Sequence, residues 1–178
     1  IYTNAVFPHQ LAIWGELTGT KIIHITTDCV FSGSLGKYTE ASVHDALDEY
    51  GKSKSLGEPK NAMVIRTSIL GPEMGGRNRS FLSWIKGQDG KTVNGFTNHY
   101  WNGLTTLELA HHLVDIIDAD LWTPGVFHVF SEDVTKYDMV KKIADAYQLD
   151  IGVEEYETDH PVDRTLRTTE ELNEYLQP

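Results

Sequence analysis

Residues 21–27 read KIIHITT, and Asp28 and Cys29 follow directly. A short, continuous run of β-branched residues is typical of a strand buried on both faces of a parallel sheet. A helical stripe of apolar residues precedes this strand at 5–17, and a second buried strand, AMVIRT, follows at 62–67. The alternation of helices and buried strands predicts an α/β fold built on a parallel sheet.

The sequence changes character from Gly71 onward, where GPEMGGRNRS is glycine-rich and loop-like. The elements expected beyond this loop are a short helix at 80–86, helices opened by capping boxes at Thr105 and Thr135, a strand at 125–131 and a last helix opened by Thr168 and Glu171. We therefore expect residues 1–70 to form one domain and residues 71–178 to form a smaller α/β lobe.

Composition excludes several classes of protein. The 178 residues are 40% hydrophobic and 23% charged, which is typical of a globular protein, and the net charge of −11 disfavours binding to nucleic acid or an anionic membrane. The only cysteine, Cys29, cannot form an internal disulfide, as expected in a reducing cytoplasm. There is no apolar run long enough to span a membrane and no His-Glu-x-x-His motif, so we expect a cytoplasmic protein without a metal.

Two groups of residues could carry chemistry. Tyr50 and Lys54 stand four apart at the start of an expected helix, where they share one face. A neighbouring ammonium favours the phenolate, so Lys54 is expected to lower the pKa of Tyr50 and make it a usable acid. Thr26 and Thr27 end a buried strand, where ligands bind in open α/β sheets. The alternative is an ordinary helix surface and ordinary β-branched residues filling a strand.

These residues lie within longer stretches that carry a resemblance. The segments are ITTDCVFSG from Ile25, YTE from Tyr38, DEYGKSKSLGE from Asp48, VIRTSILG from Val64 and GVFHVFSEDVTKYDMVKKIADAYQLD from Gly125. Together they resemble the extended short-chain dehydrogenase/reductase family, and within it the dTDP-4-dehydrorhamnose reductases. The resemblance implies the C-terminal part of a Rossmann-type sheet plus a substrate-binding lobe.

The resemblance also implies an activity: NADPH- or NADH-dependent reduction of a nucleotide-linked 4-keto-6-deoxy sugar, in deoxysugar or cell-surface polysaccharide biosynthesis. Thr27 would hydrogen-bond the substrate carbonyl, Tyr50 would give it a proton, and Lys54 would hold the nicotinamide ribose. The remaining expected contacts are Thr26, Arg66 and Thr67 for the cofactor, and Asn78, Asn98, Tyr100 and Trp101 for the nucleotide sugar. The protein is also expected to form a homo-oligomer.

The family binds its dinucleotide through a Gly-x-Gly-x-x-Gly loop, and this sequence contains none. We therefore expect the first half of the Rossmann sheet to be missing and the 178 residues alone to be inactive. Arg77, Arg79, Lys86 and Lys91 form a local basic stretch that is either a diphosphate site or a solvated face.

Two alternatives to a reductase remain: a sugar-nucleotide epimerase and a non-catalytic binding protein. The related sugar-nucleotide dehydratases carry Glu where Cys29 stands, and a thiol is a poor substitute for that base, so Cys29 favours a reductase or an epimerase over a dehydratase. The second alternative is a non-catalytic binding protein, because the family also includes the regulatory subunit of methionine adenosyltransferase. The Thr27, Tyr50 and Lys54 set favours the enzyme, since a scaffold has no need of it.

Overall fold

The first sheet of the computed structural model contains both predicted buried strands. Strand β1 (Ile23–Thr27) pairs in parallel with β2 (Met63–Thr67), which pairs in parallel with β7 (Gly125–His128). The structure describes residues 1–73, 75 and 79–176, except for the side chains of residues 173 and 174. Because Thr27 pairs with Thr67, the carboxyl ends of β1 and β2 meet at one edge. The predicted α/β fold is confirmed.

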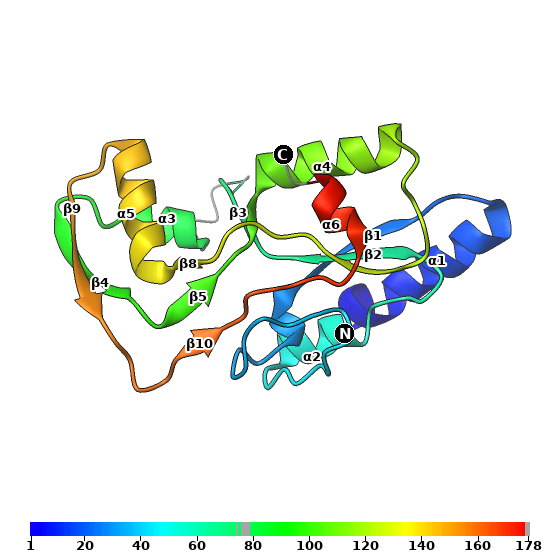
Figure 1. Cartoon of the computed structure of the whole chain (residues 1–178), viewed down its shortest axis with the longest axis horizontal. Helices are drawn as coiled ribbons and strands as arrows, with labels where there is room; N and C mark the ends of the chain where they lie inside the picture. Colours follow the sequence, from blue (N-terminus) through cyan, green and yellow to red (C-terminus); the bar gives the residue numbers. More distant parts are fainter. Residues whose placement is uncertain (74, 76–78, 177–178) are drawn as a thin grey trace.

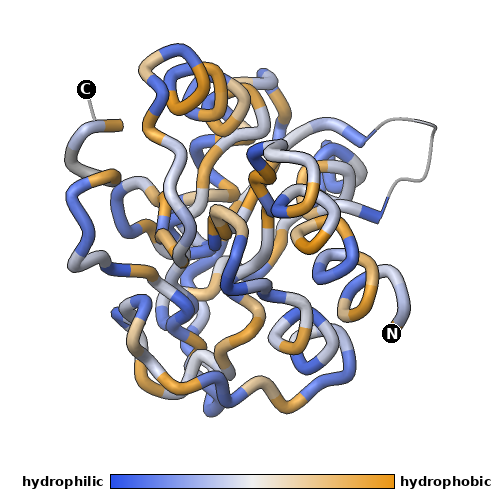
Figure 2. Tube along the Cα trace, turned by 90° about the vertical axis from the view of Figure 1, so that its right-hand side faces the viewer, coloured by the Kyte–Doolittle hydropathy of each residue, from blue (hydrophilic) through white to orange (hydrophobic). Residues whose placement is uncertain are grey.

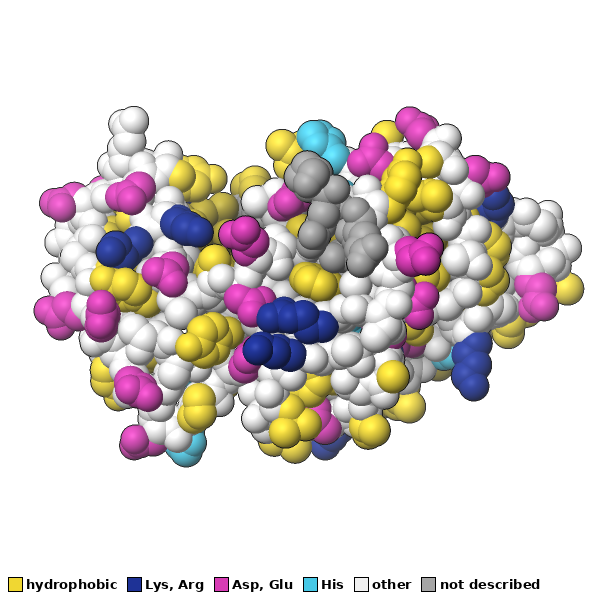
Figure 3. Space-filling view, in the orientation of Figure 1, with side chains coloured by type: hydrophobic (Ala, Val, Ile, Leu, Met, Phe, Trp, Pro, Cys, Tyr) yellow, Lys and Arg dark blue, Asp and Glu magenta, His cyan; other side chains and the backbone are white. Residues whose placement is uncertain are grey.

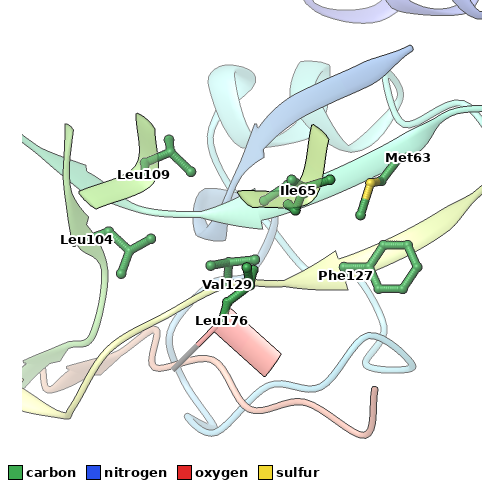
Figure 4. Close-up of a cluster of buried hydrophobic side chains, with 8 residues drawn as sticks. Met63, Ile65, Leu104, Leu109, Phe127, Val129 and Leu176 are labelled. Carbon is green, nitrogen blue, oxygen red and sulfur yellow. The ribbon is translucent and has the colours of Figure 1, made fainter. Parts of the chain in front are cut away.

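Helices cover both faces of this sheet (Figure 1): α4 (Thr106–Asp118) and α6 (Glu171–Leu176) lie on one side, and α1 (Phe7–Thr18) and α2 (Glu49–Ser55) lie on the other. Side chains alternate across β2, so Met63 and Ile65 face α4 and α6. They join Phe127, Val129 and side chains from both helices in one buried cluster (Figure 4), whose other members are Leu104, Leu109, Ile116 and Leu176. This core packs β2 and β7 against α4 and α6, and so holds the carboxyl ends of the strands in position.

A second lobe lies beside the first sheet. Its outer part is the parallel pair β4 (Lys91–Phe96) and β9 (Ile151–Tyr156), covered by α3 (Phe81–Lys86) and α5 (Lys136–Tyr147). The short strands that connect it to the first sheet are β5 (His99–Trp101), β8 (Val134–Thr135), β10 (Val162–Asp163), and the pair β3 (Ile69–Leu70) and β6 (Leu104–Thr105). Apolar and hydrophilic residues alternate along the helical turns (Figure 2), as expected for helices that bury one face.

The chain returns to the first sheet after residue 71. Strand β7 pairs with β2, and Leu176 of α6 packs into the core beneath them. The expected boundary at residue 70 therefore does not separate the two lobes, because the pairing of Met63 with Gly125 brings later residues back into the first sheet. The lobes are built from interleaved segments.

Two of the three expected helix N-caps are present in the structure. Both capping boxes form: Thr105 with Glu108 opens α4, and Thr135 with Asp138 opens α5. The expected cap at Thr168 is wrong, because its hydroxyl donates to the Glu40 carboxylate at 2.6 Å and α6 begins only at Glu171. At the other end of the chain, a π-helical turn, η1 (Tyr2–Val6), precedes α1.

The long polar segment after Thr27 is held against the sheet. It begins with the 3-10 turn η2 (Asp28–Val30), and Phe31 and Tyr38 then stack with their ring centroids 4.2 Å apart. Tyr38 also forms a β-bridge with Leu166 near the end of the chain. Two segments distant in sequence thus hold the residues around Asp28 in place. None of the helices in the described ranges is long and apolar enough to cross a membrane.

Candidate functional site

A cleft of about 350 Å³ opens where β1 and β2 end. Its lining includes Thr26, Thr27, Tyr50, Lys54 and Thr67. The two threonines of β1 reach it because the strand ends there, and α2 brings Tyr50 and Lys54 across from the opposite side. The structure thus brings together all three predicted catalytic residues and two of the additional predicted cofactor contacts.

The Thr27 hydroxyl both donates and accepts a hydrogen bond within the chain. Its Oγ1 donates to Oδ1 of Asp28 at 3.1 Å and accepts from the backbone N–H of Cys29 at 3.1 Å. The neighbouring Thr26 is different: within the described part of the chain, its buried Oγ1 has no hydrogen-bond partner. An unpaired buried hydroxyl is costly. Thr26 therefore has an unsatisfied polar atom buried at the edge of the cleft.

Tyr50 lies at the first turn of α2, which Asp48 caps by accepting the backbone N–H of Gly51 at 2.8 Å. Burial raises the pKa of Tyr50, nearby Cys29 adds to the increase, and a hydrogen bond with Thr27 acts in the opposite direction. The predicted lowering by Lys54 is therefore wrong. The Lys54 ammonium is directed toward the Ile25 carbonyl, 3.4 Å away, instead of stabilising a phenolate.

Lys54 is a partly desolvated cation. Burial lowers the pKa of its ammonium, and the Glu58 carboxylate partly offsets this. The Ile25 carbonyl is its only hydrogen-bond acceptor among the described residues. Its remaining N–H donors are available to hydroxyl oxygens of a ligand in the cleft. The free Thr26 hydroxyl and the Lys54 ammonium are the kind of groups that hold a ribose, so the residues present fit the nicotinamide end of a dinucleotide.

Arg66 does not lie in the cleft, although it was predicted to contact the cofactor. Its side chain is buried, with Nη2 2.7 Å from the Glu58 carboxylate and Nη1 3.2 Å from Nε2 of His128. The next residue, Thr67, does line the cleft. Arg66 is therefore part of a buried ionic network.

A second cavity, of about 450 Å³, adjoins the cleft. The two share Asp28, Cys29, Ser68 and Ile69 in their linings, so a ligand can extend from one into the other. The rest of the second lining is mainly aromatic and basic: Leu70, Phe81, His99, Tyr100, Trp101, Lys136, Met139, Val162 and Arg164. In Figure 3 the space-filling surface is hollowed between the outer lobe and the rest of the molecule.

The predicted substrate contacts divide three ways. Tyr100 and Trp101 line the second cavity, and Trp101 Nε1 donates to Ser68 Oγ at 2.8 Å. Asn98 does not line it, because its amide donates to the Thr158 carbonyl at 2.7 Å and accepts from the Thr158 N–H at 3.3 Å. Asn78 lies outside the described residues.

The basic stretch is not at the cavity where the structure describes it. The Lys86 ammonium lies 3.9 Å from the centroid of the Tyr147 ring, and Lys91 donates to the Gly87 carbonyl. Arg79 does not line the cavity either, and Arg77 lies outside the described residues. The cations at the cavity are instead Lys136 and Arg164.

Sequence reasoning missed three charged residues of the site: Asp28, Lys136 and Arg164. Asp28 is buried, and burial raises the pKa of its carboxyl against the opposing pull of Thr27 and Arg164. Its position next to Thr27 was a usable signal, because side chains after a buried parallel strand face the ligand crevice. No comparable signal marks Lys136 or Arg164, since the lobe packing alone brings them there. The described residues include no cluster of three or more His, Cys, Asp or Glu suited to a metal ion.

Several known proteins are similar to this chain in sequence or in fold. Methionine adenosyltransferase 2 subunit beta of Xenopus tropicalis is 28% identical over 179 residues, covering 92% of this chain and 53% of the relative. A hypothetical dTDP-4-dehydrorhamnose reductase from Sulfolobus tokodaii is 28% identical with a TM-score of 0.74, covering 92% of this chain and 61% of that one. The Bacillus anthracis dTDP-4-dehydrorhamnose reductase, solved in complex with NADP, also superposes with a TM-score of 0.74 at 20% identity, covering 92% of this chain and 63% of that one.

The chain spans about half the length of the curated relative from Xenopus tropicalis. A family model described as the RmlD substrate binding domain matches residues 2–170, nearly the whole chain. The match includes both strands that form the cleft and the lobe that forms the second cavity. This chain belongs to the RmlD substrate binding domain family.

Proposed function

We propose that this chain provides the catalytic acid and the sugar pocket of an NADPH- or NADH-dependent reductase of nucleotide-linked 4-keto-6-deoxy sugars. The observation that carries the proposal is that Thr27, Tyr50 and Lys54 line one cleft, which adjoins an aromatic cavity large enough for part of a sugar nucleotide. Such a reductase would act in deoxysugar or cell-surface polysaccharide biosynthesis.

Each residue has a separate part in this reaction. The nicotinamide, when bound, supplies a hydride to the carbonyl carbon, so negative charge develops on the oxygen. Tyr50 then transfers its phenolic proton to that oxygen, because a tyrosine is protonated at neutral pH and its proton is available for transfer. The Thr27 hydroxyl, which donates a hydrogen bond to Asp28 in the structure, would turn to donate to the same carbonyl oxygen. Lys54 holds the ribose.

The decisive experiment is steady-state reduction of dTDP-4-keto-6-deoxyglucose by the natural protein that carries this sequence, and by its Tyr50→Phe variant. Phe keeps the ring but lacks the proton, so kcat should fall about 10²–10⁴-fold with KM nearly unchanged. Tyr147→Phe, which removes a hydroxyl from the exposed surface of α5, is the matched control and should leave both constants unchanged. Retention of more than about half the activity by Tyr50→Phe excludes the acid role.

The comparisons favour one second function, that of a regulatory subunit. The relative from Xenopus tropicalis is named as a subunit of methionine adenosyltransferase, and that function needs no proton transfer from Tyr50. The test is sedimentation of the protein with purified methionine adenosyltransferase. If the wild type and the Tyr50→Phe variant both cosediment with that enzyme and alter its kinetics equally, and the wild type reduces no keto sugar, then the protein is the regulatory subunit.

A further inference from the structure

Two cations in the second cavity have no part in the proposed proton transfer. The Lys136 ammonium has only the Met139 sulfur, 3.6 Å away, as a hydrogen-bonding neighbour among the described residues. Arg164 donates through Nε to the Phe31 carbonyl at 3.0 Å, and this is its only hydrogen bond within the same part of the chain. Neither takes part in any of the ion pairs found there.

Lys136 is held in a largely apolar setting. Its Nζ lies 4.4 Å from the ring centroid of Phe81 and 5.7 Å from that of Trp101. Burial lowers the pKa of this ammonium, while Asp28 acts to raise it. A partly desolvated cation without a direct counter-ion is costly, and an incoming anion removes that cost.

The charges around the cavity do not cancel. Asp28 is its one acidic lining residue among those described, and burial raises the pKa of that carboxyl. The lining thus contains two cations, Lys136 and Arg164, and one acid. The cavity is therefore cationic, in a chain whose net charge is −11. Acidic side chains are spread over the face shown in Figure 3, and the lining of the cavity carries the opposite sign. Such a local field concentrates anions.

We propose that Lys136 and Arg164 form an anion-binding subsite for the substrate, with Phe81 and Trp101 as its apolar wall. The ligand group is a phosphate of a sugar nucleotide or the carboxylate of an acidic sugar, since both present oxygens that an ammonium and a guanidinium bind. This inference rests on the proposed function for the identity of the substrate, and it names the residues that select a charged one.

The test is an NMR titration of the 178-residue chain that follows the indole signal of Trp101, with inorganic pyrophosphate, glucuronate and neutral glucose as separate probes. We expect pyrophosphate to bind, and Lys136→Met and Arg164→Met each to weaken binding about tenfold or more. Lys141→Met is the matched control: it lies on the same helix, and its ammonium donates to Tyr137 on the exposed surface, so affinity should not change. Lys136→Arg should retain binding.

The outcomes separate the two sources of the anion. If the variants weaken pyrophosphate, the subsite binds phosphate; if they weaken glucuronate alone, it binds a sugar carboxylate. The proposal is overturned if the wild type binds neither anion better than glucose, or if Lys141→Met weakens binding as much as Lys136→Met. Thermal melting identifies a variant that fails to fold, and the other variant then decides. The titration contains no nicotinamide and no turnover, so its result is independent of the Tyr50→Phe test.

Discussion

Tyr50 and Lys54 show how burial sets the behaviour of single side chains. Spacing alone predicts that the ammonium stabilises the phenolate, but the folded cleft desolvates both groups. Burial raises the pKa of Tyr50 and lowers that of Lys54. Both shifts favour the neutral form of each group. The phenol therefore carries its proton at neutral pH and is a weaker acid than a free tyrosine.

Lys54→Met should weaken cofactor binding as well as the rate, whereas Tyr50→Phe should lower the rate alone. Loss of the ammonium removes a ligand of the ribose, so we expect the KM for the nicotinamide to rise about tenfold while kcat also falls. Steady-state kinetics with varied NADPH measures both. Lys52→Met, on the exposed face of the same helix, is the control and should change neither. An unchanged KM for NADPH in Lys54→Met contradicts the ribose role.

His128 belongs to the buried network around Arg66. An arginine only donates, so Nε2 of His128 accepts from Arg66 at 3.2 Å and Nδ1–H donates to the Arg167 carbonyl at 2.8 Å. The ring is therefore neutral in this arrangement. Burial lowers the pKa of His128 and Arg66 adds to this effect, while the facing Glu40 carboxylate opposes it. Protonation would place an N–H against the guanidinium.

We expect the free energy of unfolding to decrease as pH falls below about 6.5, the ordinary pKa of histidine. The folded-state pKa is below the unfolded one, so the unfolded chain binds more protons, and stability is lost on acidification until the folded pKa is passed. Urea unfolding between about pH 5 and pH 7.5 measures the slope. His128→Gln should make it shallower, with His24 and His44 supplying the remainder. Equal slopes for His128→Gln and the wild type would contradict the assignment, and His111→Gln on the surface of α4 is the control.

At the scale of elements, α2 is positioned by its close approach to η2. A Cβ at Gly51 would lie 2.2 Å from the Cys29 carbonyl oxygen and 2.6 Å from Cβ of Ala46. Only glycine allows the helix to lie this near the turn after β1. That contact places Tyr50 across the cleft from Thr27.

Gly51→Ala should therefore disturb the site as well as the fold. We expect a destabilisation of about 1–3 kcal/mol from overpacking, and a loss of keto-sugar reduction because α2 moves away from β1. Thermal melting and the reductase assay measure the two effects. Gly87→Ala is the matched control, because its Cβ would meet nothing closer than 3.4 Å. If both variants melt alike, the close approach is not needed.

At the scale of the whole molecule, one side of the first sheet is open. Strand β1 is an edge strand, since the order is β1-β2-β7. On the neighbouring helix α1, Ile13, Trp14 and Leu17 are 53%, 52% and 82% exposed. An edge strand with exposed apolar side chains beside it is a surface prone to association.

We expect the 178-residue chain to self-associate through this side. Sedimentation velocity at increasing concentration should show dimers or larger species, and Ile13→Glu with Leu17→Glu should shift the distribution toward monomer. Leu107→Glu replaces a similarly exposed leucine on α4, away from β1, and should have no effect. A monomer at all concentrations contradicts the prediction.

The sequence by itself determined the buried strands expected at 21–27 and 62–67, the caps at Thr105 and Thr135, and the placing of Tyr50 and Lys54 on one helix. These features depend on local periodicity, on hydrogen bonds within one turn, or on a motif whose spacing is short. Only the tertiary structure decided that β7 returns to the first sheet, that Arg66 binds Glu58 outside the cleft, and that Lys136 and Arg164 line the same cavity as Asp28. The physical reason is that strand partners, side-chain environments and the charge balance of a cavity depend on contacts between distant segments, which local patterns do not encode.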